Sequence, residues 1–492
     1  MNILFVTSEA YPLIKTGGLA DVAASLPRAL LKRDHSVRLV LPAYPRVLEA
    51  ARKVGLKPLA SLTYGERNIT VWQTRLPGTR VTVWLVDMPE FSNRGGNPYV
   101  DDQGLDWPDN HRRFYWFGVV AAELAMGRAG VDWRADLVHG NDWQSGMAMA
   151  LLAQEPKRPA LVFTIHNLAY HGLFPYSAFA ELSLPEHWWH PEAMEFYDQL
   201  SFIKGGLVFA DQITTVSPSY AREIQTPEFG CGLDGLLFAR QAQLSGILNG
   251  IDTQEWNPGR DPHLTQNYSR RNLKQKVVNK LALQERVGLP PSEETPLLGF
   301  IGRLVEQKGV DLMLSALPEF LKRGECQFVI LGSGQAQYHT ALKELQALYP
   351  EQLALTLGYD EGLAHQIEGG VDLFLMPSLF EPCGLNQLYS LRYGTLPLVH
   401  AVGGLNDTVF ESSDQTEDGT AAESTPDNGF RFEAPTASAL RDALTRALAL
   451  YHQPDRWRQR QLNAMKGDYS WEKSAQEYER VYEQALQVRD QH

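Results

Sequence analysis

The chain is poor in cysteine, in basic residues and in long apolar runs. Its 492 residues include three cysteines, Cys231, Cys326 and Cys383, and no two of them form a C-x-x-C pair. This spacing excludes a disulfide framework and any zinc-binding motif that could be recognised in the sequence. It also favours a reducing compartment. The longest nearly uncharged apolar stretch, Phe114 to Ala122, is too short to span a bilayer. The N-terminus lacks the features of a secretory signal, so we expect a cytoplasmic protein.

Basic residues are outnumbered by acidic ones. The chain has 45 Lys and Arg against 58 Asp and Glu, which gives a net charge of −13. This balance argues against nucleic acid or a membrane surface as the main partner. With 44% hydrophobic and 21% charged residues, the composition is that of a globular protein. Domains hold roughly 100–200 residues each, so the length predicts two or three of them. The oligomeric state cannot be read from the sequence.

Short apolar runs alternate with segments of helical periodicity along most of the chain. In the first half, the runs are Asn2–Val6, Val37–Leu41, Val81–Leu85, Leu137–His139 and Leu161–Thr164. In the second half, they are Leu297–Ile301, Phe328–Leu331, Ala354–Leu357, Leu373–Met376 and Leu396–His400. The alternation predicts an α/β protein with two parallel sheets, each covered by helices. The two halves join near residue 250, and we expect ligands beyond the carboxyl ends of the strands.

The last part of the chain predicts one loop and two helices. Glu411 to Asn428 is rich in Asp, Glu, Ser and Thr, which is typical of a surface loop. An apolar stripe follows at Leu440, Leu444 and Leu448. A second stripe begins after Ser470, a suitable N-cap, and comprises Trp471, Ala475, Tyr478, Tyr482 and Ala485. The second stripe predicts a helix that packs back onto the first half.

Two segments carry cations near the predicted strand ends. In Lys15-Thr16-Gly17-Gly18, glycines let backbone N–H groups approach an anion, although an ordinary tight turn has the same pattern. The spacing matches neither the dinucleotide fingerprint nor the Walker A loop. Arg303 and Lys308 follow a predicted strand on what we expect to be one loop, where two cations can neutralise a diphosphate. Charge-assisted hydrogen bonds contribute about 1.5–3 kcal/mol each, but two solvated cations are the alternative.

Acidic and histidine side chains follow other strands. Glu381 precedes a Pro-Cys-Gly turn that opens a helix, so its carboxylate can accept hydrogen bonds from sugar hydroxyls while free backbone amides bind phosphate. The alternative is a helix-stabilising charge worth ~0.3–1 kcal/mol. His139 and His166 lie at strand ends, and either one can be a structural hydrogen-bonding group. Asp101-Asp102 lies in a loop beside Gln and Gly, and we assign it no metal.

Together these segments resemble the bacterial glycogen synthase and plant starch synthase family, whose members are retaining glycosyltransferases of the GT-B fold. The matching segments, which run in family order along nearly the whole chain, are Lys15–Val22, Pro108–His111, Thr164–Tyr170, Val216–Ala221, Asn249–Asp252, Arg303 with Gln307–Gly309, Glu381–Leu385 and Gly403–Leu405. The resemblance implies two Rossmann-like domains facing across a deep cleft, with the C-terminal helices packing back on the N-terminal domain. It places the acceptor-side domain at 1–248, the nucleotide-sugar domain at 249–465 and the returning helix at 466–492.

The resemblance also implies an activity and a set of site residues. The activity is transfer of glucose from ADP-glucose to the nonreducing-end 4-hydroxyl of an α-1,4-glucan, such as glycogen or a maltooligosaccharide, with no cofactor and no metal. The implied catalytic residues are Arg303 and Lys308 at the diphosphate, Glu381 at the glucose hydroxyls, and His166 and Asp142 at the glucose. The implied donor-binding residues are Lys15, Gly17, Gly18, Asn249, Tyr359 at the adenine, Cys383, Gly384, Leu385 and Asn386. Asp21 falls in the same implied cleft without an assigned role.

Some positions depart from the family pattern, and alternatives remain. Asn386 stands where Thr is usual, Leu379 where Arg is usual and Gln144 where His is usual. Tyr389 takes the place of the second Glu of the broader Glu-x7-Glu glycosyltransferases, which favours the narrower family. A transferase that uses UDP-glucose, a phosphorylase with pyridoxal phosphate on a Lys, and a non-catalytic glycan-binding protein are the alternatives. No matching Lys motif is evident for the phosphorylase.

Overall fold

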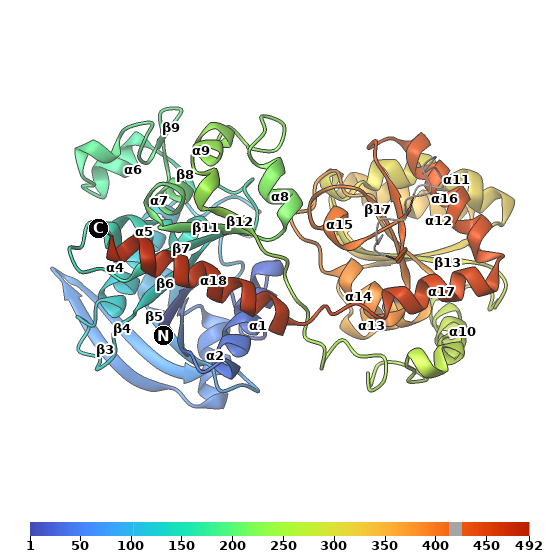
Figure 1. The fold of residues 1–492 in the computed structure, drawn as a ribbon, viewed down its shortest axis with the longest axis horizontal. Coiled ribbons are helices and arrows are strands. Elements are labelled where there is room, and N and C mark those ends of the chain that lie inside the picture. The colour runs from blue at the N-terminus through green and yellow to red at the C-terminus, as the bar shows by residue number, and fades with distance from the viewer. Residues whose placement is uncertain (102, 413–425, 492) are drawn as a thin grey trace. The chain divides into compact units, whose positions relative to one another are not determined.

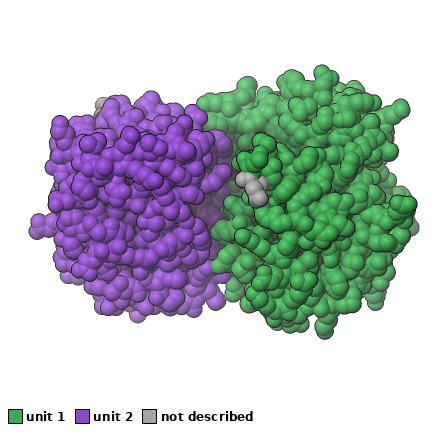
Figure 2. Space-filling model, turned by 180° about the vertical axis from the view of Figure 1, so that it is seen from behind, with its two compact units in different colours: residues 1–250, 471–492 green, residues 251–470 purple. Residues whose placement is uncertain are grey.

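A computed structural model describes residues 1–101, 103–412 and 426–491. The chain divides into two compact units, which Figure 2 shows in green and purple. Unit 1 comprises residues 1–250 and 471–492, and unit 2 comprises residues 251–470. Residues 413–425, which form most of the predicted acidic loop, lie outside the described residues, as does Asp102. None of the described helices is long and apolar enough to cross a membrane.

The described part of unit 1 is built on a nine-stranded sheet in the order β12-β11-β7-β6-β1-β2-β5-β4-β3. Its strands are β1 (Asn2–Val6), β2 (Ser36–Pro42), β3 (Lys57–Tyr64), β4 (Arg67–Arg75), β5 (Thr82–Asp87), β6 (Leu137–Asn141), β7 (Ala160–Ile165), β11 (Gln212–Thr215) and β12 (Leu244–Gly246). The central strands β6 and β7 are buried at every position, as expected for strands covered on both faces. The five predicted strands of the first half are confirmed.

One edge of this sheet differs from the expected parallel arrangement. β3 pairs antiparallel with β4, and β4 pairs antiparallel with β5. A tight turn containing Gly65, whose φ is 60°, joins β3 to β4 and allows this hairpin. β3 is an edge strand with exposed polar side chains, so it lacks the continuous apolar run that predicted the buried strands. A separate three-stranded sheet, β8-β10-β9, comprises β8 (Leu173–Pro175), β9 (Glu195–Phe196) and β10 (Gln199–Ser201).

Helices cover both faces of the nine-stranded sheet (Figure 1). Those described in unit 1 are α1 (Gly18–Lys32), α2 (Pro45–Val54), α3 (Pro89–Ser92), α4 (Asn110–Ala125), α5 (Gly146–Ala153), α6 (Tyr176–Glu181), α7 (Phe202–Phe209), α8 (Pro218–Glu223), α9 (Asp234–Ala239) and α18 (Trp471–Asp490). α18 contacts α1, β7 and β11, so the end of the chain belongs to unit 1 although it follows unit 2 in sequence. The predicted apolar stripe from Trp471 to Ala485 is buried in this contact.

Glycines allow α5 and α7 to pack with their backbones in contact. A Cβ on Gly146 would lie 1.8 Å from the carbonyl oxygen of Phe202, and a Cβ on Gly205 would lie 2.4 Å from that of Gly146. Both neighbours are backbone atoms that cannot move without displacing a helix. The two positions therefore require glycine for space and not for an unusual φ.

We expect Gly146→Ala to destabilise unit 1 by ~1–3 kcal/mol, because the helices must separate to admit one methyl group. Urea unfolding followed by circular dichroism measures the change. The matched control is Gly235→Ala, at an exposed helical position where a Cβ meets nothing within 4 Å. The control should be neutral or gain ~0.5–1 kcal/mol from helix propensity. Equal behaviour of the two variants would contradict the packing argument.

Unit 2 has a parallel sheet of six described strands in the order β15-β14-β13-β16-β17-β18. They are β13 (Leu297–Leu304), β14 (Gln327–Gly334), β15 (Leu353–Leu357), β16 (Leu373–Met376), β17 (Leu396–His400) and β18 (Phe430–Phe432). Its described helices are α10 (Lys276–Val287), α11 (Val310–Arg323), α12 (Ala336–Leu348), α13 (Glu361–Gly370), α14 (Asn386–Tyr393), α15 (Gly403–Thr408), α16 (Ala437–Tyr451) and α17 (Pro454–Ala464). The five predicted strands of the second half are confirmed, and the Leu440 stripe is buried in α16.

Candidate active site

The order of the strands in each sheet shows where a ligand-binding crevice is expected. In unit 1 the chain passes from β1 to β2 in one direction along the sheet, and from β6 to β7 in the other. In unit 2 the same reversal separates β13, which leads to β14, from β16, which leads to β17. Helices that follow such strands lie on opposite faces, and their loops part at the carboxyl edge to leave a crevice. The residues that follow β1, β6, β13 and β16 are therefore the candidate site residues.

Glu9, just after β1, organises the glycine-rich loop of unit 1. Its carboxylate accepts hydrogen bonds from the backbone N–H and hydroxyl of Thr16, and from the backbone N–H of Gly17 at 3.2 Å. Tyr99 donates its phenolic hydrogen to the same carboxylate at 2.6 Å. Glu9 is 3% exposed, so these four hydrogen bonds hold a carboxylate that is almost removed from water. Apart from the position of Glu9 near a strand end, no sequence pattern singles out Glu9 or Tyr99.

The loop presents its glycines to open space. A Cβ on Gly17 or Gly18 would meet nothing within 4 Å, and φ at Gly17 is −151°, which any residue adopts. Because Gly17 and Gly18 have no side chains, the space next to the N-terminus of α1 stays open. Lys15 forms a 2.8 Å ion pair with Asp21 in the first turn of that helix. The structure thus brings together four of the predicted residues of unit 1.

Asp142 and His166 form a second group, at the ends of β6 and β7. Asp142 has φ 54° and ψ 179°, a combination that residues other than glycine rarely adopt, and its Oδ1 accepts the backbone N–H of His166 at 2.7 Å. Desolvation raises the pKa of Asp142 to about 7, although hydrogen bonds from the backbone of His166 and Asn167 oppose the shift. His166 Nε2 lies 2.9 Å from Asn141 Oδ1, and burial lowers its pKa to about 3, so its imidazole is neutral.

The raised pKa of Asp142 predicts a pH-dependent stability. Because the folded pKa of about 7 lies above the ordinary 3.8, this carboxyl's contribution to stability is complete below pH 3.8 and is lost as pH rises through 7. Asp142→Asn keeps the acceptor oxygen in a side chain of nearly the same shape. We expect Asp142→Asn to gain up to ~4 kcal/mol of stability relative to the unchanged protein between the two pH values.

Urea unfolding at a series of pH values measures this difference. Asp132→Asn is the matched control, because Asp132 is exposed and has no hydrogen bond to the described residues. The control should show no trend with pH relative to the unchanged protein. A pH-independent difference for Asp142→Asn would contradict the assignment of a desolvated carboxyl.

Asn249 and His139, two further polar residues of unit 1, differ in whether their side chains have hydrogen-bond partners. Asn249 follows β12, is 8% exposed, and its Oδ1 is buried without a hydrogen-bond partner among the described residues. His139 is fully buried between Tyr482 of α18, at 2.8 Å, and Thr164, at 2.6 Å. His139 could have been a site residue or a structural hydrogen-bonding group. The structure supports the second, because His139 connects α18 to the sheet through these two contacts.

In unit 2, Arg303 does not lie on the loop where the sequence placed it. β13 continues to Leu304, three residues beyond the predicted strand end at Ile301, because its last residues pair with Ser333 and Gly334 of β14. Arg303 is exposed at the carboxyl end of β13 and has no ion pair or side-chain hydrogen bond with a described residue. The prediction that it shares a loop with Lys308 is wrong, but both lie at the expected sheet edge.

Lys308 and Glu381 are the closest charged pair of the candidate site. Lys308 Nζ lies 2.5 Å from Glu381 Oε2, and the two side chains are 20% and 9% exposed. Ser378 donates its hydroxyl to the same oxygen at 3.0 Å. The segments that carry them are joined by the backbone, since the N–H of Leu379 donates to Gln307 O at 2.9 Å. A cation and an acceptor-only carboxylate are thus held side by side at the end of β16.

The turn after Glu381 exposes the start of α14. Gly384 has φ 74°, which favours glycine, and no side chain caps the helix that begins at Asn386. The side-chain amide of Asn386 donates to Ile301 O at 2.8 Å, which links α14 to β13. A Cβ on Gly404 would lie 2.1 Å from the carbonyl oxygen of Cys383, so α15 packs directly against this turn. Cys383 is 4% exposed, which suits a turn residue.

Two predicted residues remain. Leu385 is the N-cap residue of α14. Tyr359 follows β15 and is 78% exposed, with its hydroxyl donated to the Glu361 carboxylate. In unit 1, the Oε1 of Gln144 is buried without a hydrogen-bond partner among the described residues. Each group of predicted residues lies at the carboxyl edge of its own sheet.

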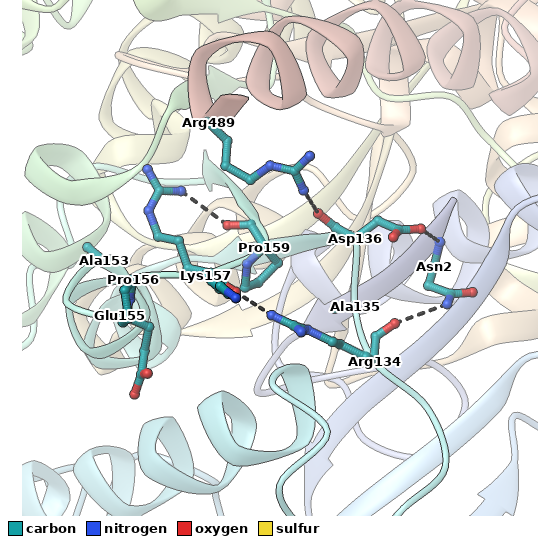
Figure 3. A pocket seen from close by; sticks show the side chains of 11 residues that line it. Asn2, Arg134, Ala135, Asp136, Ala153, Glu155, Pro156, Lys157, Pro159 and Arg489 are labelled. Atoms are coloured by element: carbon teal, nitrogen blue, oxygen red, sulfur yellow. Dashed lines mark hydrogen bonds between the residues drawn. The ribbon is translucent and has the colours of Figure 1, made fainter. Parts of the chain in front are cut away.

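A cavity of about 830 Å³ lies at the opposite, amino-terminal edge of the unit 1 sheet (Figure 3). Figure 3 shows Arg134 donating to the carbonyl of Lys157 and Arg489 donating to the carbonyl of Asp136, the latter at 3.2 Å. α5 and α18 end beside this cavity, and cations stabilise the negative ends of helices. We therefore interpret the basic residues that line the cavity as stabilising the negative ends of these two helices. None of the predicted site residues lines the cavity.

Family models cover most of both units. A model described as the starch synthase catalytic domain matches residues 2–239. A model described as glycosyl transferases group 1 matches residues 283–463. The second match contains Arg303, Lys308 and Glu381, and the first contains Asp142 and His166.

Similarity to individual proteins extends over the whole chain. The glycogen synthase of Cellvibrio japonicus is 61% identical over 481 residues, which cover 98% of each chain. The glycogen synthase of Marinobacter nauticus is 53% identical over 490 residues, which cover 99% of each chain. The catalytic domain of starch synthase IV from Arabidopsis thaliana, solved with ADP and acarbose, has a TM-score of 0.86 at 32% identity, with 99% of each chain covered. Sucrose-phosphate synthase from Thermosynechococcus elongatus, at 15% identity with 99% of each chain covered, shares the fold with a TM-score of 0.61. The chain therefore belongs to the glycogen synthase and starch synthase family of glycosyltransferases, which have the two-domain GT-B fold.

Proposed function

We propose that the protein transfers glucose from ADP-glucose to the nonreducing-end 4-hydroxyl of an α-1,4-glucan, with retention of configuration. Its membership of the family supports this reaction, and the starch synthase relative was solved with ADP. The observation that carries the proposal is the Lys308–Glu381 pair beside the uncapped start of α14. A diphosphate needs cations and free N–H groups, while a sugar needs hydrogen-bond acceptors, and this edge of unit 2 offers both kinds.

We assign the donor's diphosphate to Arg303, Lys308 and the backbone N–H groups from Cys383 to Asn386. As the glycosidic C–O bond breaks, negative charge grows on the departing diphosphate, and fixed positive groups stabilise it. Glu381, held by Lys308 and Ser378, would accept hydrogen bonds from glucose hydroxyls. The exposed ring of Tyr359 would contact the adenine.

We assign contacts with the donor to unit 1 as well: Lys15, Gly17 and Gly18 to its phosphates, and Asp142, His166 and Asn249 to its glucose. Asp142 fixes the backbone at His166 through a 2.7 Å hydrogen bond, and this supports a role for the His166 carbonyl in steadying positive charge on the sugar ring. We favour attack on the same face as departure, with the leaving phosphate oxygen taking the acceptor's proton. A glucosyl ester trapped on Asp or Glu would instead establish a double displacement.

The decisive experiment is to incubate the protein with ADP-[¹⁴C]glucose and glycogen and to measure label in the precipitated glucan. We expect incorporation that is released by an α-1,4-specific glucanase. The same assay with UDP-[¹⁴C]glucose tests the alternative donor, and faster transfer from UDP-glucose would overturn the proposed specificity. Absence of transfer from either donor to glycogen and to maltooligosaccharides would overturn the function.

We further propose that the reaction takes place in the cytoplasm. No disulfide joins the three cysteines, all of which the structure describes, and this suits a reducing compartment. Fractionation of the native host with an antibody to the protein tests this location.

A further inference from the structure

A histidine and two carboxylates lie close together in unit 2, next to Tyr359, whose hydroxyl donates to the Glu361 carboxylate. Glu255, Glu361 and His365 each offer one potential ligand atom, and the three atoms lie within 4.8 Å of one another. Glu361 and His365 are one turn apart on α13, whereas Glu255 comes from the segment that precedes α10. Neither carboxylate is buried, so a solvated ion can reach them.

The histidine of this cluster is rigidly oriented. Its Nδ1 lies 2.7 Å from Asp261 Oδ2, a carboxylate oxygen that also accepts the hydroxyl of Tyr393 at 2.6 Å. The imidazole stacks on the indole of Trp256, with ring centroids 3.9 Å apart and an interplanar angle of 5°. Asp261 and His365 therefore form the carboxylate–histidine pair that commonly orients a metal-binding imidazole and fixes its tautomer.

The other ring nitrogen of His365, Nε2, forms a long ion pair with Glu361. The side chain is 3% exposed, yet Nε2 lies 3.9 Å from the nearer oxygen of Glu361, too far for a hydrogen bond.

We propose that Glu255, Glu361 and His365 bind a divalent transition-metal ion, with Nε2 of His365 as the nitrogen ligand and Asp261 as the orienting carboxylate. Zinc takes imidazole and carboxylate ligands at ~2.0–2.2 Å, so three such ligand atoms lie roughly 3.4 Å apart. Flexible glutamate side chains need to move by about 1 Å to reach this geometry. The imidazole disfavours Ca²⁺ and Mg²⁺, which prefer oxygen ligands, and a water completes a tetrahedral site.

The test is titration of the full chain with Zn²⁺ by isothermal calorimetry, in a Cys231→Ser background that removes the exposed thiol. We expect a single tight site whose affinity falls at least ~10-fold in Glu255→Gln, because one anionic ligand is lost. The matched control is Glu344→Gln, at an exposed residue of α12 whose side chain has no hydrogen bond to a described residue, and it should bind like the parent. Circular dichroism of each variant confirms that it is folded.

Co²⁺ supplies a spectroscopic signature for the ligand set. We expect visible absorption bands of a four-coordinate Co²⁺ with nitrogen and oxygen ligands, and Asp261→Asn should weaken binding by ~10–100-fold. Absence of a tight Zn²⁺ site, or tight binding that is unchanged in Glu255→Gln, would overturn the proposal. In that case His365 is a protonated structural residue that pairs with Asp261. Either outcome is independent of the glucosyl-transfer assay.

Discussion

Lys308→Gln is expected to lower kcat by ~10²–10³ with ADP-glucose and glycogen, because the diphosphate loses a fixed positive charge as it departs. Lys308 is held 2.5 Å from Glu381, so a change at Lys308 also affects a carboxylate that is 9% exposed. Loss of this charge-assisted hydrogen bond is expected to cost ~1.5–3 kcal/mol of stability. Steady-state kinetics and urea unfolding measure the two effects separately.

A double variant distinguishes the catalytic role of Lys308 from a purely structural one. Lys308→Met with Glu381→Gln removes both charges, so no uncompensated charge remains and most of the lost stability should return. Activity should not return, since neither the cation nor the carboxylate is present. If the double variant regains both stability and near-normal kcat, Lys308 serves the fold alone and the proposed role is wrong.

The sequence predicted the buried strands well and the exposed edge poorly, for one physical reason. β1, β7 and β16 are buried along almost their whole length, so they appear as short runs of mainly apolar and β-branched residues. β3 and β4 cover one edge of the unit 1 sheet, where exposed polar residues alternate with partly buried ones. That pattern overlaps with the pattern of loops, and the antiparallel hairpin was missed.

The sequence likewise predicted some features of the candidate site and not others. Residues that follow a strand directly, such as Asp142 after β6 and Glu381 after β16, could be placed at the carboxyl edge from the chain order alone. Which side chains from distant segments bond to one another could not be predicted. Tyr99 reaches Glu9 across 90 residues, and Lys308 reaches Glu381 across 73. These contacts depend on how the chain folds in three dimensions, which neither spacing nor composition encodes.

Arg303 shows how a correct prediction of position can accompany a wrong prediction of local structure. Its strand continues to Leu304 because β14 offers pairing partners there, and strand length beyond the apolar run depends on that neighbour. As a result, the side chain lies exposed at a strand end, without a bonding partner among the described residues. Arg303 therefore makes no described contact that would be lost on substitution, which makes it the cleanest test of the diphosphate assignment.

Arg303→Ala is expected to lower kcat by ~10²–10³ while the free energy of unfolding stays within about 0.5 kcal/mol of the parent. Arg303→Lys should recover part of the activity, because the charge remains but the two-pronged guanidinium does not. The matched control is Arg458→Ala, at an exposed arginine of α17 with no ion pair to a described residue, and it should be fully active. A folded Arg303→Ala enzyme with near-normal kcat and KM would show that the diphosphate is neutralised elsewhere. Lys308 and the start of α14 would then have to supply all of the charge stabilisation, and loss of Lys308 alone should cost more than ~10³ in rate.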